Sequence, residues 1–138
     1  MTIRFNRQQG RYDCGISVAA MLLNISYQKT RKLWRSFYPD SRCPGHRGIH
    51  IDELESFLLE HGGPWKKWKS ENFQEAPTLF DWKPSHPLNA IMTWQGKGYQ
   101  SHWLGYCHGI VYDPHHDGPR LAKDCLRGPH KVVAGISL

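Results

Sequence analysis

A cysteine at position 14 follows an aspartate and precedes a glycine and an apolar run, in the stretch RQQGRYDCGISVAAMLLN over residues 7–24. A thiol attacks a carbonyl carbon well only as the thiolate, and an ordinary cysteine with a pKa of about 8.5 is mostly protonated at neutral pH. The positive end of a helix dipole and a nearby imidazolium both favour the thiolate. If a helix begins at Cys14, its side chain is placed for nucleophilic chemistry.

A histidine and an aspartate at the two ends of a predicted hairpin supply the partners that such a cysteine needs. His102 begins the apolar run HWLGY, Asp113 ends the run GIVYD, and a tight CHG turn centred on His108 joins the two runs. His102 lies six residues before that centre and Asp113 five after it, so pairing of the runs makes them near neighbours. Asp113 could then orient the His102 ring toward a thiol, as the third group of a nucleophile, base and orienter set.

A glutamine completes this set of candidate residues. Gln8 lies six residues before Cys14, in a loop that must double back to enter the helix. Its side-chain amide could donate to an oxyanion together with the Cys14 backbone N–H, an effect commonly worth a few kcal/mol. We interpret Asp13 as the N-cap of the helix and not as the acid of the triad.

The first half of the chain carries the pattern of three helices after a short strand over residues 2–6. An apolar stripe follows Cys14 as far as Ile25, and Ser26 is a good N-cap for a second helix that ends at about Phe37. The stretch IDELESFLLEHGG predicts a third amphipathic helix. The glycines at its end, Gly62 and Gly63, are interpreted as a C-cap and not as a self-cleavage site.

The second half is rich in short β-prone runs separated by turn residues. WKKWK at 65–69 predicts an amphipathic edge strand, and four further runs predict an antiparallel sheet: 89–94, 101–107, 109–113 and 131–137. A long polar connection precedes the last run. Helices first and a sheet second predict an α+β fold.

Length and charge limit the remaining possibilities. The 138 residues favour a single domain over 1–138, with a helical half at about 1–62 and a sheet half at about 63–138. The net charge of +6 would attract an acidic protein partner, whereas the scattered basic residues disfavour a nucleic-acid interface. The sequence shows no signal peptide and no apolar run long enough to cross a membrane, so we expect an intracellular, cytoplasmic protein without membrane contact.

The cysteines have two alternative interpretations. Taken alone, Cys14 is most simply a small packed thiol, but its order with the candidate glutamine, histidine and aspartate favours a nucleophile. Cys43 and His46 form a Cys-x-x-His pair that could join Cys107 and Cys125 around zinc. Without a matching second pair this spacing is more typical of a loop, so we predict no metal and no cofactor.

The order of these residues along the chain resembles that of the papain-like cysteine peptidases. The stretches QGRYDCGISVAAMLL, GIHIDELESFLLEHGG and HPLNAIMTW are similar to the C39-like group, the bacteriocin-processing peptidases that cut after double glycines. The resemblance implies a papain-like fold in which helices, with the nucleophile at the start of the first main one, pack on an antiparallel sheet. It implies Cys14 as nucleophile, His102 as general base and acid, Asp113 as orienting acid and Gln8 as oxyanion donor. The chain departs from the family in carrying Ile16 after Cys-Gly and in having a shorter hairpin.

The resemblance implies a stand-alone thiol hydrolase, most simply a cysteine peptidase that acts on a peptide or protein substrate. The membrane segments and ATPase of transporter-linked members are absent from this sequence, so the substrate is not inherited with the fold. Deamidation or acyl transfer by the same triad remains an alternative. Another is an inactive papain-like protein that binds and inhibits a host or cellular partner through its basic surface, and a third, weaker one is a nucleic-acid-binding module. The sequence does not indicate an oligomeric state.

Overall fold

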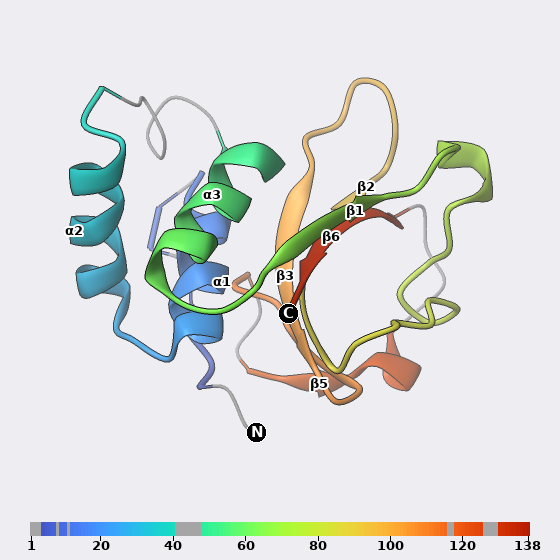
Figure 1. The fold of residues 1–138 in the computed structure, drawn as a ribbon. Helices are drawn as coiled ribbons and strands as arrows, with labels where there is room; N and C mark the ends of the chain where they lie inside the picture. Colours follow the sequence, from blue (N-terminus) through green and yellow to red (C-terminus); the bar gives the residue numbers. More distant parts are fainter. Residues whose placement is uncertain (1–3, 8, 11, 41–47, 116–117, 126–129) are drawn as a thin grey trace.

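The structure is a computed structural model that describes residues 4–7, 9–10, 12–40, 48–115, 118–125 and 130–138. Within these residues three α-helices come first in the chain and six β-strands follow them. Figure 1 shows the helices gathered on one side of the molecule and the strands on the other. The chain therefore has an α+β fold, as the order of the sequence patterns predicted.

The three helices differ in how they begin and in how deeply they are buried. They are α1 (Cys14–Leu23), α2 (Tyr27–Phe37) and α3 (Ile51–His61). Ser26 caps α2 as predicted, because its hydroxyl accepts a hydrogen bond from the Lys29 amide at 3.1 Å. Helix α1 is buried from Cys14 to Leu22 and packs against both α2 and the sheet, so it forms the centre of the helical layer.

The strands form one antiparallel sheet in the order β1-β6-β2-β3-β4-β5. The last strand of the chain thus lies between the first two, next to the edge strand β1. The strand bounds are as follows: β1 Lys66–Lys69, β2 Leu88–Trp94, β3 His102–Cys107, β4 Ile110–Tyr112, β5 Arg120–Leu121 and β6 Lys131–Ser137. Strand β1 lies at an edge, as the WKKWK pattern predicted.

The turn between β3 and β4 is as tight as the CHG sequence predicted. Cys107 pairs with Ile110, so only His108 and Gly109 form the turn. Both have a positive φ, 48° and 84°, the geometry of the two-residue turns that match the twist of antiparallel strands. Because the turn has two residues, the register of the whole hairpin is fixed, and so are the positions of its two far ends.

Both faces of the sheet are buried, by different parts of the chain. The three helices cover one face, where Ile16, Trp34, Phe57, Trp103 and Ile136 belong to one apolar cluster. On the other face a second cluster, of Ile91, Leu104, Tyr106, Val111, Cys125 and Val132, packs against side chains of the segment between β1 and β2. Because both faces are packed, the strands are held in place, and so are the residues at the strand ends.

Three details differ from the sequence-based expectations. Residues 4–7 form no strand, so the described part of the strand predicted at 2–6 was wrong. Helix α1 ends two residues early because Asn24 adopts the left-handed conformation, with φ at 56°. The polar connection after β4 contains the two-residue strand β5 and a short 3₁₀ turn at Ala122–Asp124, elements too short to give a pattern.

Among the described residues, no helix has the length and apolar character needed to cross a bilayer.

Candidate active site

Cys14 is the first residue of α1, the position at which the helix dipole presents its positive end. Cys14 lies where α1 packs against β3, and the residue is 8 % exposed. The absence of a side chain at the following residue, Gly15, allows α1 to approach Ile49, and Trp103 of β3, closely. A Cβ added there would lie 2.9 Å from Cδ1 of Ile49 and 3.3 Å from Cδ1 of Trp103. The Cys-Gly step therefore brings the thiol against the sheet.

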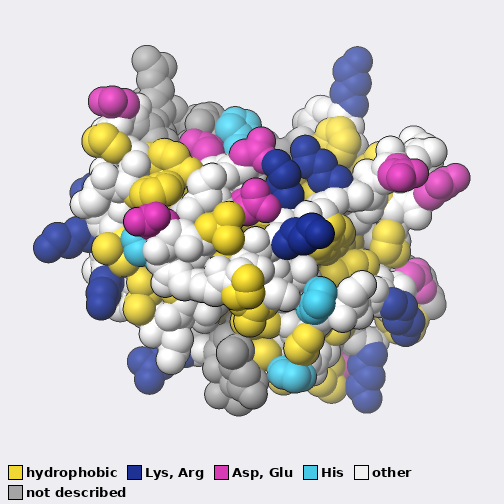
Figure 2. All heavy atoms as spheres, viewed as in Figure 1, with side chains coloured by type: hydrophobic (Ala, Val, Ile, Leu, Met, Phe, Trp, Pro, Cys, Tyr) yellow, Lys and Arg dark blue, Asp and Glu magenta, His cyan; other side chains and the backbone are white. Residues whose placement is uncertain are grey.

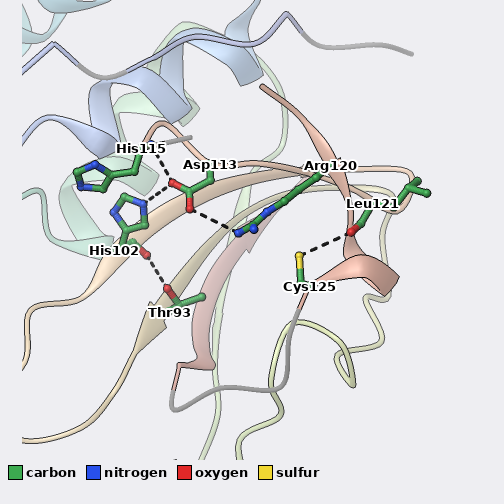
Figure 3. Close-up of polar contacts among 7 residues, drawn as sticks. All are labelled: Thr93, His102, Asp113, His115, Arg120, Leu121 and Cys125. Carbon is green, nitrogen blue, oxygen red and sulfur yellow. Dashed lines mark hydrogen bonds and ion pairs between the residues drawn. The ribbon is translucent and has the colours of Figure 1, made fainter. Parts of the chain in front are cut away.

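His102 and Asp113 meet at the open end of the β3–β4 hairpin (Figure 3). Nε2 of His102 lies 2.7 Å from Oδ1 of Asp113. The register pairs Gly105 with Tyr112, so Asp113 comes opposite the residue after Trp103 and is a diagonal neighbour of His102. The prediction that pairing of the two runs makes His102 and Asp113 near neighbours is therefore confirmed.

The Asp113 carboxylate has further partners. The backbone N–H of His115 donates to its Oδ1 at 2.9 Å, and Nη2 of Arg120 on β5 lies 3.9 Å from its Oδ2 (Figure 3). The Asp113 side chain is only 10 % exposed, so these donors and charges replace most of the water it would otherwise contact. These partners fix the carboxylate in the orientation in which its Oδ1 contacts Nε2 of His102.

The charge state of His102 follows from its two neighbours. Burial by itself would lower the pKa of His102, but the hydrogen bond with Asp113 and the contact with Cys14 outweigh burial and raise the pKa from 6.5 to about 9. His102 is therefore an imidazolium at neutral pH. Since Nε2 faces Asp113, Nδ1 is the ring nitrogen left to interact with the Cys14 sulfur. An imidazolium in contact with a thiol favours the thiolate.

Cys14, His102 and Asp113 line one cavity of about 580 Å³. That volume lies within the range typical of small-molecule and cofactor sites, about 300–1,000 Å³. Three further histidines line it: His50 before α3, His115 after β4 and His130 before β6. His115 is exposed, and the centroid of its ring lies 4.9 Å from that of the His102 ring. Cys14 is thus largely buried, but its thiol is accessible to a molecule that enters this cavity.

Asp13 occupies the N-cap position of α1, but its side chain does not cap the helix. The carboxylate turns back to accept hydrogen bonds from the amides of Gln9, at 3.2 Å, and Gly10, at 2.9 Å, and from the Tyr27 hydroxyl. Because Asp13 is 1 % exposed, several donors are needed to satisfy its charge, and the loop provides them. The predicted N-cap position of Asp13 is confirmed, but its side chain makes no capping hydrogen bond. The assignment of Asp113, and not Asp13, to His102 agrees with the geometry.

The remaining predicted residues lie partly outside the described part of the chain. Gln8, the expected oxyanion donor, is outside it, and so are Cys43 and His46 of the alternative zinc site. Cys107 belongs to the cluster beneath the helices and Cys125 to the cluster on the opposite face of the sheet. Among the residues that the structure describes, no group of three or more His, Cys, Asp or Glu side chains is arranged to hold a metal ion.

The surroundings of the thiol contain groups that the sequence did not predict. His50 and His130 reach the cavity from elements far apart in the chain, and nothing in their local sequence marks them. Comparison with known proteins found no matching family model and no matching curated protein. A functional assignment therefore rests on the chemistry of this site.

Proposed function

We propose that this chain is a papain-like thiol hydrolase, a cysteine peptidase with Cys14 as its nucleophile. One observation carries the proposal: the thiol at the start of a buried helix contacts an imidazole that a buried carboxylate orients, and all three groups line one cavity. This is the arrangement of nucleophile, base and orienting acid that acyl transfer requires. The proposed papain-like fold is supported by helices that pack the thiol against an antiparallel sheet.

Acylation begins with the Cys14 thiolate and the His102 imidazolium. The sulfur attacks the carbonyl carbon of the scissile amide, and a C–S bond forms as the carbonyl electron pair moves to oxygen. The backbone N–H of Cys14, in the first turn of α1, faces the developing oxyanion, and Gln8 is proposed as its second donor. His102 then gives its proton to the amide nitrogen, the C–N bond breaks, the amine leaves and a thioester remains.

Deacylation uses the same groups in reverse. Neutral His102 takes a proton from a water molecule while the water oxygen attacks the thioester carbonyl. The C–S bond breaks, the carboxylic acid product leaves, and the thiolate and imidazolium are restored. Asp113 keeps the ring in one orientation throughout, because it accepts from Nε2 in both steps.

The proposal is tested by incubating the protein with a mixture of peptides obtained by digestion of a whole proteome. We expect new peptide termini with the wild-type chain and none with Cys14→Ala. The matched control is Cys125→Ala, which removes a buried thiol on the other face of the sheet and should leave cleavage unchanged. Conversion of glutamine to glutamate without new termini would assign deamidation to the site. Equal cleavage by Cys14→Ala would refute the assignment of the nucleophile.

A further inference from the structure

A second cavity, of about 350 Å³, lies at the opposite end of β2 from the His102 pair. Asn89 of β2 lines it, whereas His102 pairs with Thr93 of the same strand. Four residues of extended chain separate the two positions, which corresponds to about 14 Å along the strand. The second cavity is therefore distinct from the one at Cys14, and none of the residues that line it lines the other.

One wall of the second cavity consists of stacked aromatic rings. Trp68 of β1 lies directly over Gly135 of β6, where an added Cβ would collide with the indole. Trp82 stacks on Trp68 with ring centroids 5.6 Å apart and 20° between the planes. Trp82 in turn meets Tyr106 edge-on, at 5.0 Å. The wall is thus braced against the sheet and presents indole surface to the cavity.

The cavity also contains polar side chains that are almost fully buried. Asn89 is 1 % exposed and Ser137 is 7 % exposed, and the two residues pair across β2 and β6. The Asn89 amide donates to the carbonyl oxygen of His86 at 2.7 Å, which fixes the loop that precedes β2. A buried amide and a hydroxyl beside a cavity are suited to hydrogen-bonding a ligand oxygen.

Positive charge surrounds the opening. Lys66 of β1 and Lys83 of the loop before β2 line the cavity and are exposed, together with His86. Figure 2 shows Lys and Arg side chains gathered where β1 crosses the front of the molecule. Of the lysines that line the cavity, Lys67 is paired with Asp52, and its backbone N–H donates to Glu55 at 2.8 Å. The acidic side chains of α3 thus meet Lys67, whereas Lys66 and Lys83 line the cavity as exposed basic residues.

We propose that this cavity binds an aromatic phosphate, a small anion with a flat ring. The lysines bind the phosphate, the buried Asn89 amide and Ser137 hydroxyl donate hydrogen bonds to its oxygens, and the indole wall packs against the ring. The volume is large enough for a single ring system with its phosphate and too small for a helix or a folded domain. Such ligands include free nucleotides, in which a ribose joins the phosphate to the ring, and phosphotyrosine, in which the two are bonded directly, and both offer an anion and a ring face to this cavity.

The test is titration of the full chain with 5′-AMP and with N-acetyl phosphotyrosine, followed by tryptophan fluorescence and by calorimetry. Adenosine, N-acetyl tyrosine and inorganic phosphate are the fragment controls. We expect one of the two aromatic phosphates to bind at least about tenfold more tightly than any fragment, since it gains both the ring and the charge contacts. The tighter of the two identifies the source of the ligand. Trp82→Phe should reduce the fluorescence response while calorimetry still detects binding.

Charge variants separate this site from general attraction to a basic protein. Lys83→Gln should weaken binding by about tenfold, because it removes one charge-assisted contact. Lys97→Gln, which removes the same charge from the exposed loop between β2 and β3, should change binding less than about twofold. Equal weakening by both variants, or no binding of either aromatic phosphate at millimolar concentration, would overturn the proposal. Cys14→Ala should bind as the wild type does, so this result is independent of the proposed hydrolase.

Discussion

Replacement of Asp113 by asparagine removes the negative charge beside His102 and keeps the shape of the side chain. The amide oxygen can still accept the His115 N–H, which donates to Asp113 at 2.9 Å in the native chain. The difference between a pKa of 6.5 and one of about 9 corresponds to about 3 kcal/mol in favour of the His102 imidazolium, at about 1.4 kcal/mol for each pH unit. Asp113 and Cys14 together supply this preference against the effect of burial. We therefore expect Asp113→Asn to lower the pKa of His102 by at least about one pH unit.

The same change has a defined effect on stability. Because folding raises the pKa of His102, the stabilisation is complete below pH 6.5 and is lost as the pH rises through about 9. Asp113→Asn should lower the free energy of unfolding by about 1 to 3 kcal/mol at pH 6, and the difference from the wild type should shrink by pH 10. NMR titration of the histidine ring protons and urea unfolding measure the two effects, with His102→Gln to assign the resonance.

The matched control for this prediction is Asp124→Asn, which removes an exposed carboxylate from the 3₁₀ turn after β5. It should leave the pKa of His102 within about a few tenths of a pH unit of the wild-type value, since exposed charges are screened. If His102 titrates identically in the wild type and in Asp113→Asn, the carboxylate does not control the imidazole. That result would refute the reasoning.

Three further predictions follow from the packing and the charges of the site. Peptide cleavage should fall as the pH rises through about 9, because the His102 imidazolium that protonates the leaving amine is lost; a rate that keeps rising to pH 10 would contradict this. Gly15→Ala should lower the free energy of unfolding by about 1 to 3 kcal/mol, because its Cβ would meet Ile49 at 2.9 Å; Gly48→Ala, with no atom within 4 Å, is the control in urea unfolding. Tyr27→Phe should cost about 1 to 3 kcal/mol because the buried Asp13 loses a donor, and a loss no greater than that of exposed Tyr99→Phe would exclude the effect.

Much of the fold was predictable because its signals are local. The Ser26 hydroxyl, the glycines after α3 and the two-residue turn at His108 and Gly109 each act within a few residues of their own position. The pairing of His102 with Asp113 was predictable for the same reason. These residues are eleven apart in sequence, and the turn between them sets the register.

The parts of the site that were not predictable depend on packing between distant elements. Local sequence does not show how far α1 approaches β3, which depends on the space at Gly15 between Ile49 and Trp103. Nor does it show that His50 and His130 reach the same cavity. The contact between Cys14 and His102 was expected from their order along the chain and from the family resemblance, and not from any pattern near either residue.

Asp13 illustrates how burial overrides a local preference. An aspartate directly before a helix commonly caps it, and the sequence offered no reason to expect otherwise. Its carboxylate is buried, however, and the amides of Gln9 and Gly10 together with the Tyr27 hydroxyl satisfy it more fully than a single helix amide would. The burial of the Asp13 carboxylate depends on the packing of α2, which carries Tyr27, and this packing cannot be predicted from the local sequence pattern.

The reactivity of Cys14 toward iodoacetamide tests the central claim most directly. The rate of alkylation is measured from pH 5 to 10 by intact mass and peptide mapping, in the wild type and in His102→Gln. We predict that wild-type Cys14 reacts at pH 6 much faster than Cys14 in His102→Gln, whose rate should rise only toward the ordinary thiol value of about 8.5. Slow alkylation at pH 6 that does not change when His102 is replaced would contradict the proposed thiolate–imidazolium pair.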